Sequence, residues 1–245
     1  PVTMEEVEEA KSIIEAHGEP FNYDGWKLLV ERHGGKLPLK IRAVKEGTVV
    51  PTHNVLMTVE TTDPDFYWLA SYFETALMRV WYPITVATQS HYLRKLIYGF
   101  LEKTADDPDA EIAFKLHDFG SRGVSSQESA GLGGLAHLIS FMGTDTMQAL
   151  LVGRNYYHAD MAGFSIPAGE HSTFSSWGRD GEVEAYRNML GKFGHTGKLL
   201  AVVSDTWDIY NACENIWGGV LKQEVIDSGA TVVIRPDSGD RKSVV

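Results

Sequence analysis

Leu199-Leu200-Ala201-Val202-Val203 is a continuous apolar run that ends at a polar stretch beginning with Ser204. A short apolar run with β-branched members, bounded by polar residues, predicts a buried strand. A helical pattern follows over Asp208 to Trp217, and a second β-rich run covers Thr231 to Ile234. Strand, helix and strand in this order predict a parallel β/α unit, with ligand groups on the loops that follow the strands.

The same alternation extends back to the polar turn Asp106-Asp107-Pro108-Asp109, so we expect an α/β part over residues 106–245. It should contain a strand at Ile112 to Leu116 and helices at Ser125 to Phe141, Thr144 to Val152 and Tyr186 to Phe193.

Residues 1–105 have a different pattern, which predicts a helical and β-rich domain. The expected elements are an amphipathic helix from Met4 to Ala16 capped by Thr3, a helix from Asp24 to His33, a small antiparallel sheet between Leu37 and Thr61 that includes Thr48-Val49-Val50, a long aromatic helix opened by Asp63-Pro64, and another from Pro83 to about Lys103.

Composition restricts the class of protein. The chain has 245 residues, 43% of them hydrophobic, and a formal net charge of -11, which disfavours binding to nucleic acid. No apolar run is long enough to cross a membrane. Cys213 is the single cysteine, and Pro1-Val2-Thr3 begins no signal peptide, so we expect a cytoplasmic protein. Because the chain has no initiator Met, we also expect it to be part of a longer one.

The stretch Ser165-Ile166-Pro167-Ala168-Gly169-Glu170-His171-Ser172-Thr173 is the first candidate for chemistry. His171 is expected at the start of a helix, where free backbone amides attract anions. Histidine is the residue type that changes charge near neutral pH, so this side chain could donate, accept or carry a proton.

The segment His117 to Gly123 is a second candidate, because polar and glycine residues there follow a predicted strand. Arg122 offers a bidentate clamp for phosphate, and Phe119 could stack on a planar ring. The alternatives are a surface arginine and a buried core aromatic, and spacing alone favours the core position for Phe119.

Three further loops place polar groups after strands or at helix starts. Asp145 could accept a hydrogen bond from a ligand amide or act as a first-turn acid. Ser204 and Asp208 belong to a loop with two acidic and two hydroxyl side chains. Helix capping would account for one of these four polar side chains more easily than for all of them. Arg235 and Asp237 flank a rigid proline. The alternative is a solvated turn, which the sequence of this segment also favours.

These loops resemble those of the nicotinamide phosphoribosyltransferases, in one order along nearly the whole chain. The matching segments are Trp81 to Thr88, Lys115 to Gly120, Arg122 to Glu128, Gly143 to Thr146, Glu170 to Thr173, Asp208 to Glu214 and Ile234 to Gly239. Each motif alone is weak, whereas the ordered set is specific.

The resemblance implies an irregular α/β barrel of the type II phosphoribosyltransferases with an additional β-rich domain, in a homodimer with shared active sites. Residues 106–245 would then be a partial barrel. The family joins nicotinamide to 5-phosphoribosyl 1-pyrophosphate with Mg²⁺, giving nicotinamide mononucleotide and pyrophosphate. ATP is an optional co-substrate that phosphorylates a histidine.

Roles follow from motif position only. Phe119 should stack on the pyridine ring, and Asp145 should accept from the carboxamide and so favour nicotinamide over nicotinate. His171 should be the phosphorylated histidine, and Arg122 should contact phosphate. Arg235 should lie near the carboxamide and the ribose phosphate, and Asp237 near the ribose hydroxyls. The other expected site residues are Ser165, Ile166 and Ala168, which should line the tunnel beside the ring, and Ser204 and Asp208, which should support the site.

Two alternatives to a nicotinamide phosphoribosyltransferase stay open, and departures from the family bear on the second. Members are considerably longer, and this chain lacks the segment that would supply the partner subunit's aromatic ring and the glycine-rich phosphate loop expected after Arg235. The alternatives are a nicotinate phosphoribosyltransferase and a truncated, non-catalytic binding fragment.

Overall fold

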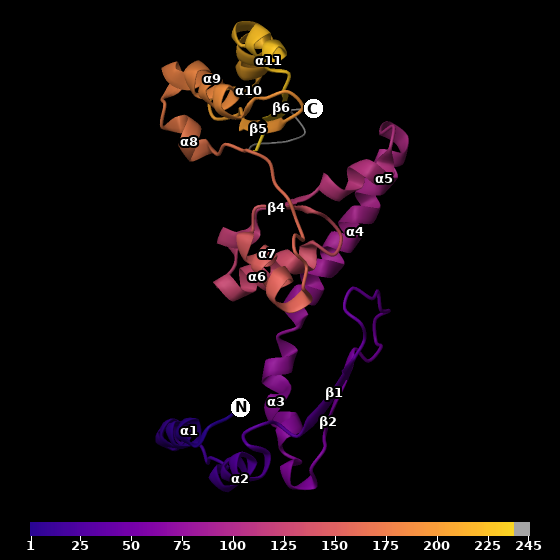
Figure 1. Ribbon diagram of the computed structural model, residues 1–245, viewed down its shortest axis with the longest axis vertical. Helices are drawn as coiled ribbons and strands as arrows, with labels where there is room; N and C mark the ends of the chain where they lie inside the picture. The colour runs from indigo at the N-terminus through magenta and orange to yellow at the C-terminus, as the bar shows by residue number, and fades with distance from the viewer. Residues whose placement is uncertain (238–245) are drawn as a thin grey trace. The chain divides into compact units, whose positions relative to one another are not determined.

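The computed structural model describes residues 1–237 of the chain (Figure 1). The chain divides into two compact units, Pro1–Gly163 and the residues from Phe164 onward, which are described separately. The predicted domain boundary between residues 105 and 106 stays a prediction.

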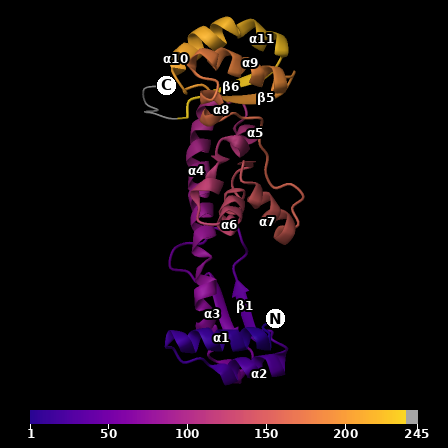
Figure 2. The same ribbon diagram turned by 90° about the vertical axis from the view of Figure 1, so that its left-hand side faces the viewer.

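The first unit begins with two capped helices, both as predicted. Helix α1 (Met4–His17) starts with a reciprocal capping box in which Thr3 N donates to Glu6 Oε2 over 2.8 Å and Glu6 N donates to Thr3 Oγ1 over 3.3 Å. Helix α2 (Tyr23–His33) ends at Gly34, whose φ of 59° is left-handed. The two helices lie side by side (Figure 2).

An antiparallel pair follows, as expected from the β-rich sequence. Strand β1 (Leu39–Ala43) pairs with β2 (Met57–Thr61), Leu39 lying opposite Thr61 and Ala43 opposite Met57. Thr48-Val49-Val50, predicted as a third strand, forms none, and the Val49 side chain is 70% exposed. β-Branched residues favour strands only where a neighbour offers pairing and burial, and this segment has neither.

The rest of the first unit is mainly helical. The predicted aromatic helix is divided into a 3₁₀ turn and α3, and α6 is shorter than predicted. The elements are η1 (Pro64–Phe66), α3 (Leu69–Met78), α4 (Trp81–Thr104), α5 (Pro108–Glu111), η2 (Ile112–Phe114), η3 (Gly120–Gly123), α6 (Gln127–His137) and α7 (Met147–Tyr157). Helix α6 packs against both α4 and α7.

The predicted strand at Ile112 to Leu116 is wrong. Asp107 caps α5 by accepting a hydrogen bond from Ala110 N, and Pro108 occupies its first turn. This helical start continues into η2, so the alternating apolar residues Ile112 and Phe114 belong to a helical turn. The strand lies just beyond: β3 (His117–Asp118) pairs in parallel with β4 (Gly143–Thr144).

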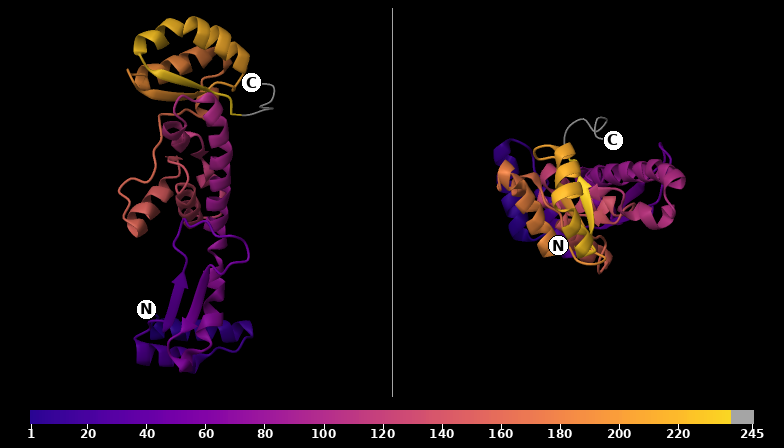
Figure 3. Two further views of the ribbon diagram at one scale, coloured as in Figure 1. Left: turned by 90° about the vertical axis from the view of Figure 1, so that its right-hand side faces the viewer. Right: turned by 90° about the horizontal axis from the view of Figure 1, so that it is seen from above.

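The second unit contains the parallel pair that the opening stretch predicted. Strands β5 (Leu199–Val203) and β6 (Thr231–Arg235) run in the same direction, with Leu199 opposite Thr231 and Val203 opposite Arg235. The helical elements are α8 (His171–Ser175), η4 (Arg179–Gly181), α9 (Glu182–Phe193), α10 (Ile209–Asn211), the π-helical segment η5 (Ala212–Val220) and α11 (Lys222–Ser228). Figure 3 shows these helices close to the two strands.

The core of this unit lies between β5 and its helices. It is a single cluster whose aromatic members are Phe174, Tyr186 and Trp217. The Tyr186 and Trp217 rings stack with centroids 4.9 Å apart, and Phe174 meets Tyr186 edge-on. Burial of these rings together with β5 holds the strand ends in place.

The class is therefore mixed α/β, as predicted, with parallel pairing after residue 106. The barrel implied by the resemblance stays a prediction, because the strands within residues 1–237 form two-stranded sheets. In the same range no helix is both long enough and apolar enough to cross a membrane.

Candidate functional site

Three parallel segments end at one edge of the second unit. Residues 167–169 lie along β5, since Ala201 N donates to Pro167 O over 2.9 Å and Gly169 N donates to Ala201 O over 3.1 Å. Strand β6 lies along the other side of β5. Because the carboxyl ends of parallel strands meet at one edge, the residues that follow the three segments are brought together there.

His171 is the centre of this edge. Its Nε2 lies 2.8 Å from Asp205 Oδ1, and its Nδ1 lies 3.6 Å from Asp237 Oδ2. Asp205 also accepts a hydrogen bond from Asp237 N at 2.7 Å, and its side chain is 8% exposed. One nearly buried carboxylate therefore fixes both the imidazole and the loop after β6, while His171 itself is 37% exposed and accessible.

Arg235 ends β6 beside the same cluster. Its Nη2 donates to Gly169 O over 3.4 Å, and its Nε lies 3.7 Å from Asp237 Oδ1. The guanidinium thus joins the segment before His171 to the loop after β6. The structure brings together the predicted residues His171, Arg235 and Asp237.

Ser204 and Asp208 have local partners in the structure. Ser204 is fully buried; its hydroxyl donates to Val202 O and accepts from Trp217 Nε1 at 3.1 Å. Asp208 caps α10 by accepting from Asn211 N at 3.0 Å. These contacts suit a supporting role for both residues, and they account for Asp208 as an N-cap.

A buried polar pair lies next to Ser204. Tyr186 Oη donates to Glu182 Oε1 over 2.8 Å, and both residues are buried. Burial raises the pKa of the Glu182 carboxyl, because the charged form loses its hydration, although the bond from Tyr186 opposes this change. The pair thus helps to support the strand edge at which His171 lies.

The predicted tunnel residues lie on the segment that leads to His171. Ser165, Ile166 and Ala168 are all exposed, and Ala168 forms a parallel bridge to Ala201. Ile166 retains 38% exposure. The segment can therefore present side chains to a ligand while β5 holds its backbone.

A second edge lies in the first unit, after β3 and β4. His117 Nε2 is 3.1 Å from Asp145 Oδ1, and the His117 and Phe119 rings pack with centroids 4.6 Å apart at an interplanar angle of 31°. The Asp145 backbone N donates to Asp118 O over 2.9 Å, which extends the strand pairing to Asp145. A ring and a carboxylate are thereby placed next to the same histidine.

The sequence favoured a core position for Phe119, and that expectation is wrong because its side chain is 51% exposed. Arg122 lies in η3, three residues further along, and is exposed. Both side chains can therefore reach a ligand in solution.

Asp205 and His117 are the site residues that the sequence did not single out. Asp205 lies in the loop after β5 in which the sequence indicates Ser204 and Asp208 as site residues. His117 was the first residue of the predicted loop after a strand, and it proved to be in the strand itself. In both cases position at a strand end was the available signal.

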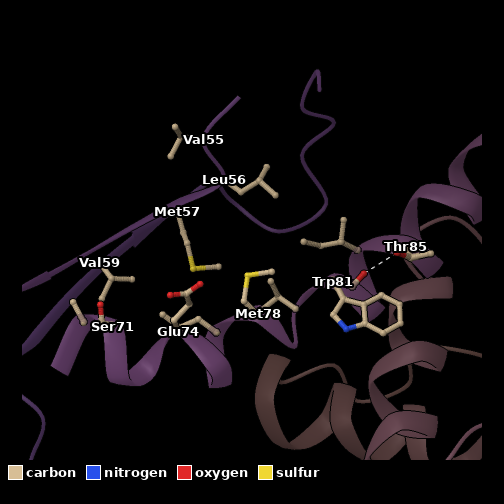
Figure 4. A pocket seen from close by; sticks show the side chains of 13 residues that line it. Val55, Leu56, Met57, Val59, Ser71, Glu74, Met78, Trp81 and Thr85 are labelled. Atoms are coloured by element: carbon tan, nitrogen blue, oxygen red, sulfur yellow. Dashed lines mark hydrogen bonds between the residues drawn. The ribbon is translucent and has the colours of Figure 1, made fainter. Parts of the chain in front are cut away.

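Two other features bear on ligands. Within residues 1–237, no cluster of three or more His, Cys, Asp or Glu side chains could hold a metal ion. An apolar groove in the first unit runs along β2, α3 and the start of α4, where Met57, Met78 and Trp81 line it (Figure 4). It contains none of the predicted site residues.

Comparisons with known proteins find family models and relatives that match this chain. The model of the nicotinate phosphoribosyltransferase (NAPRTase) family matches residues 114–245, and the model of the nicotinamide phosphoribosyltransferase N-terminal domain matches residues 1–41. A nicotinamide phosphoribosyltransferase from Xanthomonas campestris is 59% identical over 245 residues, covering 100% of this chain and 52% of the relative. One from Acinetobacter baylyi is 35% identical over 219 residues, covering 86% of this chain and 43% of the relative.

The chain thus spans about half the length of the curated relatives it matches. The NAPRTase model alone covers more than half of the chain, and it includes both strand edges described above. On this evidence the chain belongs to the nicotinate phosphoribosyltransferase (NAPRTase) family.

Proposed function

We propose that this chain takes part in NAD salvage by transferring the phosphoribosyl group of 5-phosphoribosyl 1-pyrophosphate to nicotinamide. The products are nicotinamide mononucleotide and pyrophosphate. The observation that carries the proposal is the 59% identity to the Xanthomonas nicotinamide phosphoribosyltransferase along the whole chain. The polar groups gathered at two strand edges support it.

The chemistry is a substitution at the sugar carbon. The pyridine nitrogen of nicotinamide forms a bond to ribose C1, the bond from C1 to the pyrophosphate oxygen breaks, and its electron pair leaves with pyrophosphate. Positive charge develops on the ribose and negative charge on the leaving group, so oriented carboxylates and cations are required. Asp237 beside the ribose hydroxyls and Arg235 beside the carboxamide and ribose phosphate would meet this need.

Base recognition is assigned to the edge in the first unit. The exposed ring of Phe119 would stack on the pyridine, and Asp145 would accept a hydrogen bond from the carboxamide. Arg122 would contact phosphate as a bidentate donor. Ser165, Ile166 and Ala168 would lie beside the ring, with Ser204 and Asp208 as supports.

Magnesium is the proposed metal, and the residues at the His171 edge fit it. Mg²⁺ is usually held by one or two carboxylates together with substrate phosphates, so a complete cage of protein ligands is not required. Asp205 and Asp237 supply two carboxylates near each other, joined through the Asp237 amide. When bound, the metal would neutralise charge that develops on the pyrophosphate.

ATP is proposed as an optional co-substrate that phosphorylates His171. The accessible imidazole begins α8, and its Nε2 is oriented by Asp205. In this step the imidazole nitrogen that carries no proton forms a bond to the γ-phosphorus, the bond from the γ-phosphorus to the bridging oxygen breaks, and its electron pair leaves with ADP. The new negative charge would lie beside two carboxylates, which makes a cation at this edge favourable.

The assembly is proposed to be a homodimer with shared active sites in the cytoplasm. This part rests on the resemblance and on the single cysteine, Cys213. Sedimentation equilibrium of the 245-residue chain would test the dimer.

Nicotinate is the second candidate substrate, because the family model that covers residues 114–245 is named for nicotinate phosphoribosyltransferase. The experiment compares nicotinamide with nicotinate at equal 5-phosphoribosyl 1-pyrophosphate, with and without ATP. Faster consumption of the amide supports the proposal, and faster consumption of the acid favours the second candidate. Turnover of neither base would leave the non-catalytic fragment as the explanation. Asp145→Asn should reduce the preference for the amide.

A further inference from the structure

His117 contacts both proposed base-binding groups of the first unit. Its Nε2 lies 3.1 Å from Asp145 Oδ1, and its ring packs against Phe119 at a centroid distance of 4.6 Å. The three residues come from β3, from the position after β3 and from the position after β4. Moving His117 would therefore disturb the stacking ring and the carboxylate together.

The fold holds this imidazole in place through a glycine. In the parallel register His117 lies opposite Gly143. A Cβ atom at Gly143 would lie 2.7 Å from His117 Nδ1 and 3.3 Å from its Cγ, closer than packed atoms tolerate. The missing side chain on β4 therefore makes the space in which the ring lies, between Gly143, Phe119 and Asp145.

The contact with Asp145 fixes the direction of the hydrogen bond. An ionised carboxylate can only accept, so the imidazole must donate its Nε2 proton to Asp145. This hydrogen bond holds the carboxylate oxygens in one orientation. Such a carboxylate accepts from the NH₂ of a carboxamide, whereas it repels the negative charge of a carboxylate ligand.

We propose that His117 is a specificity-determining positioning residue, which holds the Asp145 carboxylate in one orientation beside Phe119 and thereby selects a pyridine carboxamide over a pyridine carboxylate. The inference deepens the proposed function and rests on it for the identity of the ligand. According to this inference, replacing His117 changes the ratio of kcat/KM for nicotinamide to kcat/KM for nicotinate. A general loss of stability would lower both values and leave their ratio unchanged.

The test uses the 245-residue chain and measures kcat/KM for nicotinamide and for nicotinate. His117→Leu removes the donor and keeps an apolar side chain, and it should lower the amide-to-acid ratio about tenfold, the effect of losing one hydrogen bond to a charged group. His117→Gln places a donor near the position of Nε2 and should restore the ratio to within about threefold of the wild type. An unchanged ratio in His117→Leu, or an equal loss for both bases, would overturn the inference.

Two controls separate this effect from others. His33 forms a comparable pair with Asp63, 2.9 Å between Nε2 and Oδ2, and His33→Leu should leave the ratio unchanged. In an Asp145→Asn background, His117→Leu should lose most of its effect, because its partner no longer carries the charge. A full effect in that background would show that His117 acts by another route and would contradict the inference.

Equilibrium binding and NMR keep the inference testable if the proposed reaction fails. If the wild-type chain turns over neither base, calorimetry measures the affinity for each base instead. His117→Leu should then decrease the preference in affinity for the amide over the acid by the same factor. Absence of binding by either base counts against the inference. In ¹⁵N spectra of the imidazole, Nε2 of His117 should carry the proton, and Asp145→Asn should shift its resonance. A proton on Nδ1 instead would overturn the assigned hydrogen bond.

Discussion

Replacing Asp205 by alanine tests how the edge of the second unit is held. The carboxylate makes two hydrogen bonds that the variant lacks, one with His171 Nε2 at 2.8 Å and one from Asp237 N at 2.7 Å. No other described residue joins both of these groups through its side chain. The substitution should therefore release the imidazole and the loop after β6 together.

The expected cost follows from these two contacts. Hydrogen bonds to a charged group contribute roughly 1.5–3 kcal/mol each, so the sum would be about 3–6 kcal/mol if all groups were buried. The His171 side chain is 37% exposed, so water can replace part of what is lost. We expect the free energy of unfolding to fall by about 2–3 kcal/mol.

Urea denaturation and amide hydrogen exchange provide the two readouts. Asp208→Ala is the matched control on the same loop, because it removes only the cap of α10 and should cost about 1 kcal/mol. The Asp237 amide should exchange faster in Asp205→Ala and at the wild-type rate in Asp208→Ala. A change in stability below about 0.5 kcal/mol with unchanged Asp237 exchange would refute the reasoning.

Three further predictions concern packing and pH. Gly134→Ala should lower the melting temperature by an amount equivalent to about 1–3 kcal/mol, because its Cβ would lie 2.7 Å from Ala149 Cβ; an unchanged melting temperature would contradict this. Gly99→Ala on α4 should raise stability by about 0.5–1 kcal/mol, since no atom lies within 4 Å of the new Cβ, and a lower melting temperature would be the contrary result. Burial lowers the pKa of His137 below 6.5, so the folded state disfavours its charged form. The free energy of unfolding should then decrease as pH falls through 6.5, and His137→Gln should lose this part of the pH dependence; an identical pH profile in that variant would argue against it.

The sequence predicts the second unit well because its strands are nearly continuous apolar runs. Leu199 to Val203 has no helical period and is bounded by polar residues, so β5 was predicted with its observed bounds. His171 was likewise expected at a helix start, where the structure has it. Local pattern and tertiary packing agree at these positions.

The errors come from segments in which a local start signal or a missing partner decides the structure. Asp107 and Pro108 begin a helical turn that overrides the strand-like spacing of Ile112 and Phe114. Thr48-Val49-Val50 has strand-forming residues but no neighbouring strand in the described part of the chain. Exposure of Phe119 depends on packing that spacing does not specify.

The contacts of the candidate site depend on which segments become neighbours. Asp205 meets His171 because residues 167–169 align beside β5, and the two residues are 34 positions apart in the chain. His117 meets Asp145 only through the register of β3 and β4. Residue types along one chain indicate candidates for a site, but they do not show which of these residues come into contact in the fold.

Formation of nicotinamide mononucleotide is the most direct test of the proposed reaction. The 245-residue chain is incubated with 5-phosphoribosyl 1-pyrophosphate, nicotinamide and Mg²⁺, and the products are separated by chromatography and identified by mass. We expect equal amounts of nicotinamide mononucleotide and pyrophosphate, with a strong loss of both in Asp237→Ala. No product from the correctly folded wild-type chain, or the same yield from Asp237→Ala, would contradict it.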